Sequence, residues 1–310
     1  MIVQVLLLLL GLALIVFGAD WLVDGSSAIA RKAGISEFVI GLTIVGFGTS
    51  CPELVVSLTG ALQGNADISV GNVVGSNVFN TLLILGLTAV IAPVAVTRSN
   101  RRRDIPIALL VTFLFAAFVT TGTQITRVEG IVFLLVFAAY MFYCFKCDQG
   151  ADEAAEEKVR SLFMAILLVL AGLAGLIFGG QLFVNNATAI ARAVGVSDKF
   201  IAITLLAGGT SFPELATCIV AAAKKKDQLA LGNVLGSNVF NILLILGTSA
   251  VVTPLSTLAL TWVDLGVLLA SAALIWLWTY TGHRDRIDRW EAILMLLLFF
   301  GYYTWLFVKL

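Results

Sequence analysis

Two glutamates occupy positions in this chain that need a chemical explanation. Glu53 lies in GTSCPELVVS, residues 48–57, and Glu214 lies in GTSFPELATC, residues 209–218. Both stretches lie deep in long apolar segments, where an ionised side chain is costly and usually belongs to an ion pathway or binding site. A buried ion pair is the structural alternative, but no Lys or Arg lies at comparable depth in any apolar segment. The two glutamates therefore indicate a functional site.

Hydroxyl and amide side chains accompany both glutamates. Thr49, Ser50 and Ser57 share one helical face with Glu53 by i, i+3 and i+4 spacing. A second group is spaced i, i+4, i+8 in two copies and comprises Asn72, Ser76 and Asn80, and Asn233, Ser237 and Asn241. Packing explains the glycines of these segments and also accounts for Asn72 and Asn233. The serines and the other two asparagines need polar partners.

The prolines add backbone oxygens to this set. Pro52 and Pro213 each remove a backbone hydrogen bond, and their rings displace the carbonyls of Gly48 and Gly209. Unwound backbone at membrane depth is tolerated where it lines a cavity or a bound ion. Carboxylates, hydroxyls, amides and carbonyls together suit hard cations such as Ca²⁺, whereas softer metals favour Cys or His. Two carboxylates balance one Ca²⁺, two Na⁺ or two protons, which is the chemical basis for exchange.

Composition predicts the elements that hold these residues. The chain has 310 residues, of which 60% are hydrophobic and 12% charged, and its mean hydropathy is +1.02. Runs of about 20 apolar residues predict an all-α polytopic membrane protein. The first run lacks a basic flank and is interpreted as a span, not a cleaved signal peptide. Ten spans are expected at residues 3–27, 37–62, 69–96, 105–123, 128–147, 162–186, 198–223, 229–253, 262–280 and 290–309.

The basic residues are distributed unequally between the two sides of these spans. Fifteen of the 19 Lys and Arg residues fall in one set of alternate connections, and four fall in the other. The positive-inside rule places the richer set in the cytoplasm and both termini on the extracytoplasmic side. His283 lies in a charged cytoplasmic connection, where it is expected to be solvated.

The chain also contains an internal repeat. GNVVGSNVFNTLLILG, residues 71–86, returns 161 residues later as GNVLGSNVFNILLILG with 14 of 16 positions identical. The glutamate segments show the same offset. Five spans per unit is an odd number, so the second copy enters the membrane from the opposite side. We expect inverted repeats at 1–147 and 161–310, joined by an acidic cytoplasmic linker at 148–160 that acts as a solvated tether.

The repeated GTSxPE and GNVxGSN motifs resemble the two alpha-repeats of the calcium/cation antiporters, and most closely those of the short prokaryotic sodium/calcium exchangers. The resemblance covers essentially all ten expected spans. It implies alternating access by sliding of the first and sixth spans across a rigid core. It also implies a cation site formed by Glu53, Glu214, Thr49, Ser50, Thr210, Ser211, Ser76, Ser237, Asn80 and Asn241, with backbone carbonyls near Gly46 and Ala207.

Two features depart from that pattern or from the repeat. Asn241 stands where the archaeal-type exchangers have Asp, so both repeats end in SNVFN and the site loses one potential carboxylate. The coupling ion is therefore Na⁺, a proton, or Na⁺ together with K⁺. Asp20 and Asp24 match the neutral Gln181 and Asn185, and they either line an access path or lie hydrated near the inner end.

The sequence therefore predicts a Ca²⁺/Na⁺ antiporter of a prokaryotic plasma membrane. A Ca²⁺/H⁺ or K⁺-dependent exchanger is the nearest alternative. A cation channel is disfavoured because both halves of the site lie in one chain, which also predicts function as a monomer. An intramembrane enzyme lacks a Ser–His pair or metal-binding histidines. Cys144 and Cys147 lack the further ligands of a structural zinc site and are interpreted as incidental thiols. No cofactor or nucleic-acid partner is expected.

Overall fold

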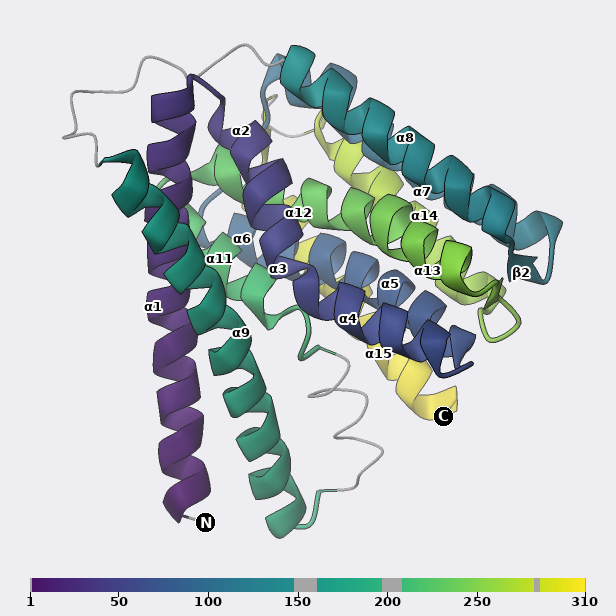
Figure 1. The fold of residues 1–310 in the computed structure, drawn as a ribbon, viewed down its shortest axis with the longest axis horizontal. Helices are drawn as coiled ribbons and strands as arrows, with labels where there is room; N and C mark the ends of the chain where they lie inside the picture. Colours follow the sequence, from purple (N-terminus) through teal and green to yellow (C-terminus); the bar gives the residue numbers. More distant parts are fainter. Residues whose placement is uncertain (1, 148–160, 197–207, 282–284, 310) are drawn as a thin grey trace.

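The computed structural model describes residues 2–147, 161–196, 208–281 and 285–309. Two long helices, α1 (Ile2–Ala33) and α9 (Leu162–Ala193), pack side by side against a larger group of helices (Figure 1). Glycines permit this close approach, because a Cβ atom at Gly18 would lie 2.8 Å from the backbone oxygen of Gly172. The pair forms a layer of its own beside the rest of the molecule.

The remaining elements form the larger group of helices. In chain order they are α2 (Glu37–Ile40), η1 (Gly41–Val45), α3 (Gly46–Thr49), α4 (Cys51–Leu62), α5 (Ala66–Val78), η2 (Phe79–Ile84), α6 (Leu85–Ile91), η3 (Asn100–Asp104), α7 (Ile105–Thr121), α8 (Arg127–Lys146), α11 (Phe212–Ala223), α12 (Asp227–Val239), η5 (Phe240–Leu246), α13 (Gly247–Val252), α14 (Trp262–Trp278) and α15 (Arg289–Lys309). The segments named η are π-helical turns that continue from neighbouring α-helices.

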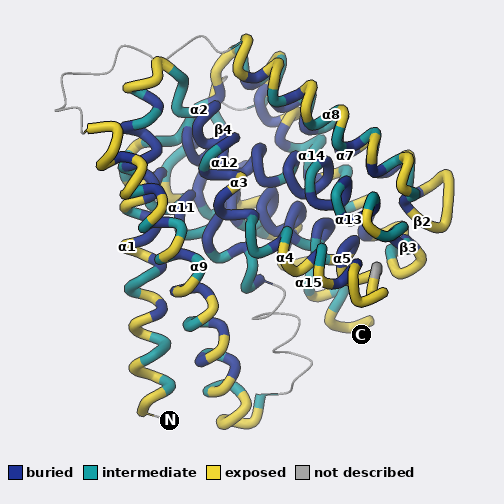
Figure 2. The backbone as a smooth tube through the Cα atoms, in the orientation of Figure 1, coloured by how far each residue is buried: buried dark blue, intermediate teal, exposed yellow. Residues whose placement is uncertain are grey.

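The core lies where the two GNVxGSN segments cross. Burial is 89% for the most apolar window of Asp227–Val252 and 72% for that of Asp67–Ile91, against 22% for α1 and 28% for α9. Figure 2 shows this gradient, with α12 dark along its length and the outer helices exposing one face. Gly232 and Gly236 lie directly against the backbone of Phe38 and Leu42, so a Cβ at either position would collide with it. Their predicted role in close helix approach is confirmed. The same prediction is wrong for Gly71 and Gly75, where a Cβ would meet no atom of the described residues within 4 Å.

Short strand pairs and arginine caps tie the two halves of the chain together. Strand β1 (Val94–Ala95) pairs with β4 (Arg286–Ile287), and β2 (Gln124–Ile125) pairs with β3 (Leu255–Ser256). The Arg127 guanidinium donates to the carbonyls of Val251 and Val252 at the end of α13. Arg289 does the same for Val90 and Ile91 at the end of α6. A cation at a helix C-terminus satisfies carbonyls that the helix itself leaves unpaired.

Length and apolarity identify seven membrane-spanning candidates among the described helices. An eighth is formed by the bent pair Glu37–Thr49 and Cys51–Leu62, and two shorter apolar helices are Phe212–Ala223 and Trp262–Trp278. Helix bounds agree closely with nine of the ten expected spans, although α1 and α9 extend several residues further. Part of the expected span 198–223 and the whole predicted linker 148–160 lie outside the described residues.

Candidate cation site

The two glutamates begin half-helices. Glu53 lies in the first turn of α4 and Glu214 in the first turn of α11, each directly after a proline at the second position of the helix. The chain bends by 47° between α3 and α4. Both side chains are fully buried. A carboxylate at a helix N-terminus faces unpaired N–H groups and the positive end of the helix dipole, which favour its charge. The predicted break therefore positions the charge as well as exposing backbone.

Serines connect the two glutamates across the halves of the chain. Ser50 donates to Oε1 of Glu214 at 3.1 Å, and Ser211 donates to Oε1 of Glu53 at the same distance. Ser211 also lies 3.4 Å from the hydroxyl of Ser76. This reciprocal arrangement brings two motifs 161 residues apart into a single site. Each glutamate keeps its second oxygen, Oε2, buried and without a hydrogen-bond partner in the described structure.

A second cluster surrounds the carbonyl of Gly46. The hydroxyl of Ser237 lies 3.4 Å from this oxygen, and Thr49 lies 3.2 Å from Oδ1 of Asn233. The Gly46 carbonyl also accepts the N–H of Ser50 at 3.1 Å. The helix stays wound through Thr49, so the Gly46 carbonyl is already engaged within the chain. Its role as a cation ligand stays a prediction.

Asn72 and Asn233 serve packing, as the sequence favoured. Asn72 Nδ2 donates to Ser57 Oγ at 3.0 Å and to the backbone carbonyl of Glu53 at 3.2 Å. Asn233 donates to the sulfur of Cys218 at 3.3 Å. These amides hold α4 and α11 against the crossing helices α5 and α12. They orient the half-helices that carry the glutamates.

Asn80 and Asn241 lie on the π-helical turns η2 and η5 and are almost fully buried. Neither polar atom of the Asn80 side chain has a partner among the described residues, and Oδ1 of Asn241 also has none. Such turns are frequent at functional sites because the wider turn changes the direction of a side chain. The i, i+4, i+8 pattern predicted one regular stripe and did not predict the π-turns.

Five buried oxygens of predicted ligand residues, here called the donor set, have no hydrogen-bond partner in the described structure. They are Glu53 Oε2, Glu214 Oε2, Asn80 Oδ1, Asn241 Oδ1 and Thr210 Oγ1. A buried polar group left without a partner costs about 1–3 kcal/mol, so several together favour a ligand that satisfies them. All five are hard oxygen donors, and two are carboxylate atoms. This set fits a Ca²⁺ or Na⁺ ion carried as substrate.

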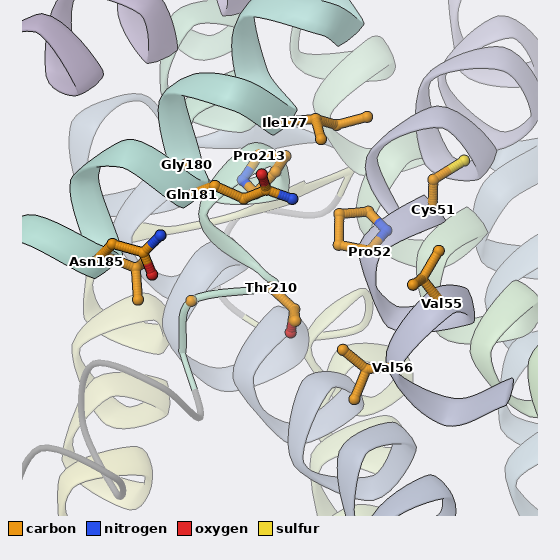
Figure 3. A pocket seen from close by; sticks show the side chains of 12 residues that line it. Cys51, Pro52, Val55, Val56, Ile177, Gly180, Gln181, Asn185, Thr210 and Pro213 are labelled. Carbon is orange, nitrogen blue, oxygen red and sulfur yellow. The ribbon is translucent and has the colours of Figure 1, made fainter. Parts of the chain in front are cut away.

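A cavity of about 310 Å³ lies beside this donor set. Figure 3 shows that it is bounded by the start of α4 on one side and by Gln181 and Asn185 of α9 on the other. Thr210 and Pro213 line it next to Glu214. The cavity lies between α4 and α9, and Thr210 is the one member of the donor set among its described lining residues. Ala207, the other predicted carbonyl position, lies outside the described residues.

The equivalent face of α1 is closed. Helix α1 packs directly on α11, and Lys224 at the end of α11 forms ion pairs with Asp20 at 2.7 Å and Asp24 at 2.6 Å. Partial burial lowers the pKa of Lys224, but hydrogen bonds and charge from the two aspartates outweigh it and raise the pKa above its ordinary value. The aspartates are thus bound to a lysine. The repeat offset matches this charged trio to the neutral Gln63, Gln181 and Asn185.

Sequence reasoning missed three polar residues of the crossing. Asn77, Thr81 and Asn238 are joined by hydrogen bonds within the core, and Lys224 was counted only as a charge in a connection. The SN dipeptide, present in both copies, was an available signal. Its asparagines, Asn77 and Asn238, lie outside the i, i+4, i+8 stripe, so the spacing predicts no role for them. Cys144 and Cys147 are free thiols, as expected.

Residues 3–146 and 164–308 match the family model described as sodium/calcium exchanger protein. The chain belongs to the sodium/calcium exchanger family. The sodium/calcium exchanger MaX1 of Methanosarcina acetivorans is 32% identical to it, with 98% of this chain and 99% of MaX1 covered. The inner membrane protein YrbG of Escherichia coli is 36% identical, with 82% of this chain and 81% of YrbG covered.

A solved structure of an exchanger has the same fold as this chain. The sodium-calcium exchanger NCX_Mj, soaked with zero Na⁺ and Ca²⁺, superposes on this chain with a TM-score of 0.86 at 35% sequence identity. The match covers 98% of this chain and 99% of that one. This family member therefore shares its helical membrane fold with an exchanger over nearly its whole length.

Proposed function

We propose that this protein is a secondary antiporter that exchanges Ca²⁺ for Na⁺ across a prokaryotic plasma membrane. The observation that carries the proposal is the pair of buried glutamates, one from each half of the chain, each bound by a serine of the other half. Their charge neutralises one Ca²⁺ or two Na⁺, so the two ions compete for the same carboxylates. Membership of the exchanger family and the likeness to MaX1 and NCX_Mj support the same exchange.

The transport mechanism proposed is alternating access between two inverted five-helix repeats, at 1–147 and 161–310, joined by the linker 148–160. The internal repeat in the sequence supports this architecture of ten spans. The charge asymmetry places both termini on the extracytoplasmic side, and Figure 1 draws the two chain ends toward the same side of the molecule. Nothing in the site requires a second copy of the chain, so the functional unit proposed is the monomer.

Open and closed faces support one direction of access. The cavity between α4 and α9 lies toward the proposed extracytoplasmic side, whereas α1 covers α11 on the proposed cytoplasmic side. We assign this arrangement to an outward-facing state. The ion pairs from Lys224 to Asp20 and Asp24 stabilise it, and they break when α1 and α9 slide over the core.

Vesicle transport tests the exchange. Uptake of ⁴⁵Ca²⁺ into inside-out vesicles is measured under an imposed Na⁺ gradient, an imposed proton gradient, or neither. We expect the Na⁺ gradient to drive uptake and the Glu53→Gln variant to show none. Uptake that ignores both gradients refutes exchange.

A Ca²⁺/H⁺ exchanger is the second candidate. Asn241 favours this candidate. Because of it the site holds two carboxylates, whereas the archaeal-type exchangers have a third acidic side chain at this position. Uptake driven by the proton gradient alone would select it over Na⁺ exchange.

A further inference from the structure

The two midplane asparagines of the site are held in different ways. Asn241 Nδ2 donates to Oδ1 of Asn77 at 2.9 Å. Asn77 is itself almost fully buried, and its Nδ2 donates to the backbone carbonyl of Asn238 at 3.1 Å. Both polar groups of Asn77 are therefore used within the protein. Its orientation is anchored by a backbone group that cannot change from acceptor to donor.

A fixed donor bond determines which end of an amide faces the site. The planar Asn241 side-chain amide carries one oxygen and one NH₂ group, which point in different directions from the same carbon. With the NH₂ group bound to Asn77, the oxygen points away from that bond, and it has no other partner in the described structure. We propose that Asn77 is a positioning residue that fixes Asn241 with its oxygen toward the transported cations and so sets their affinity. This inference rests on the proposed function.

In the described structure the equivalent hydrogen bond is not formed to Asn80 of the first repeat. Asn238 is the repeat equivalent of Asn77, and it donates to the hydroxyl of Thr81 at 2.8 Å. Ile242 is the equivalent of Thr81 and offers no hydroxyl to Asn77. Oδ1 of Asn238, the counterpart of the atom that binds Asn241, has no partner in the described structure, and neither has the Asn80 amide. Nothing there decides whether Asn80 presents its oxygen or its NH₂ group.

The difference gives the site one fixed and one adaptable amide. An NH₂ group aimed at a cation repels it, whereas a carbonyl oxygen attracts it, so the orientation of each amide matters for affinity. Asn241 contributes a preorganised ligand in place of the carboxylate that the archaeal-type pattern has there. Asn77 supplies the orientation that an amide needs and a carboxylate does not, because the two oxygens of a carboxylate are equivalent.

A double-mutant cycle tests this assignment. Equilibrium binding of ⁴⁵Ca²⁺ is measured on purified protein for the wild type, Asn77→Leu, Asn241→Asp and the double variant. Loss of one orienting hydrogen bond is expected to weaken Ca²⁺ binding by about tenfold in Asn77→Leu. In the Asn241→Asp background the same change is expected to alter affinity by less than about twofold, because a carboxylate needs no orientation.

Two further variants separate orientation from packing. Asn77→Asp keeps an acceptor for Asn241 Nδ2 but loses the donor to the Asn238 carbonyl, so its Ca²⁺ affinity should stay above that of Asn77→Leu. Thr81→Val removes a partly buried hydrogen bond of the same core but touches Asn238 instead of Asn241. It is expected to lower the melting temperature without weakening Ca²⁺ binding. The cycle is run in parallel with Asn77→Ala, in case the leucine variant does not fold.

The outcomes distinguish this inference from the proposed function. Absence of Ca²⁺ binding by the wild-type protein would overturn the proposed function itself. If the wild type binds Ca²⁺ and Asn77→Leu and Asn77→Ala bind it equally well, only the positioning role is refuted. Equal losses in both Asn241 backgrounds, or a loss in Thr81→Val as large as in Asn77→Leu, would also refute it, because either result means general loosening of the core.

Discussion

Replacing Lys224 by Gln should shift the balance between outward- and inward-facing states. The lysine joins α1 to the end of α11 through two ion pairs, of 2.7 and 2.6 Å. Its repeat equivalent is Gln63, so the substitution gives the charged face the residue of the neutral one. Because the pairs form where α1 covers α11, their loss should destabilise the outward-facing state relative to the inward-facing one.

The magnitude follows from the exposure of the three side chains. Lys224, Asp20 and Asp24 are 30%, 45% and 32% exposed, so solvent screens both pairs. Pairs of this kind contribute about 0.5 kcal/mol each, and together about 1 kcal/mol. The outward-to-inward ratio should therefore fall about fivefold, since 1.4 kcal/mol corresponds to a factor of ten. Raised ionic strength should reduce the difference between wild type and variant.

Native Cys51 provides the assay. It lines the cavity between α4 and α9, and an impermeant thiol reagent added on that side should label it when the site is open. Its repeat equivalent, Phe212, can be changed to Cys in a Cys51→Ser protein to report access from the other side. The quotient of the two labelling rates follows the outward-to-inward ratio. Cys147 is half-exposed and is changed to Ser in both proteins.

Lys225→Gln is the matched control. It removes the same charge one residue away, from an exposed side chain for which the described structure contains no ion pair. Asp20→Asn should shift the labelling quotient in the same direction as Lys224→Gln, though by less. An unchanged quotient in Lys224→Gln, or an equal shift in Lys225→Gln, would refute the role assigned to the ion pairs.

The other predictions concern the charge of the site and the neutral face. Glu53→Gln and Glu214→Gln should each abolish Ca²⁺ binding while leaving the melting temperature within a few degrees of wild type; measurable ⁴⁵Ca²⁺ exchange by either would contradict the site. Asn241→Asp should alter the Na⁺ dependence of Ca²⁺ transport because it adds a carboxylate, and an identical Na⁺ profile would show that this position does not select the coupling ion. Combining Gln63→Lys with Gln181→Asp should build the mirror ion pair, favour the inward-facing state and slow labelling of the outer cavity; faster labelling would contradict the assignment.

Much of the site could be predicted because depth in a membrane is a local property of sequence. Apolar length gave the spans, and the prolines marked where Glu53 and Glu214 begin half-helices. The identical motifs showed that two such segments must meet. None of these inferences needs the rotation of one helix against another. The π-turns were missed because the side chains around Asn80 fit a regular helical stripe as well as they fit a wider turn.

Partner choice between helices needed the tertiary structure. Asn77 and Asn238 occupy equivalent positions with identical neighbours in the chain, yet one binds Asn241 and the other binds Thr81. From the sequence, the two aspartates of α1 could either line an access path or lie in water. Both instead bind Lys224, some 200 residues away. Such contacts depend on crossing angle and helix rotation, which sequence periodicity does not define.

The sequence by itself determined the chemical inventory and its symmetry. Two carboxylates, paired serines and asparagines, and the inversion implied by five spans per repeat can all be read from residue types and spacing. The tertiary structure decided which polar atoms the protein uses for itself and which it leaves for an ion. It also decided that α1 packs on α11 while a cavity lies between α4 and α9. The physical reason is that hydrogen-bond saturation and packing depend on the distances between helices, and those distances exist only after the helices have packed.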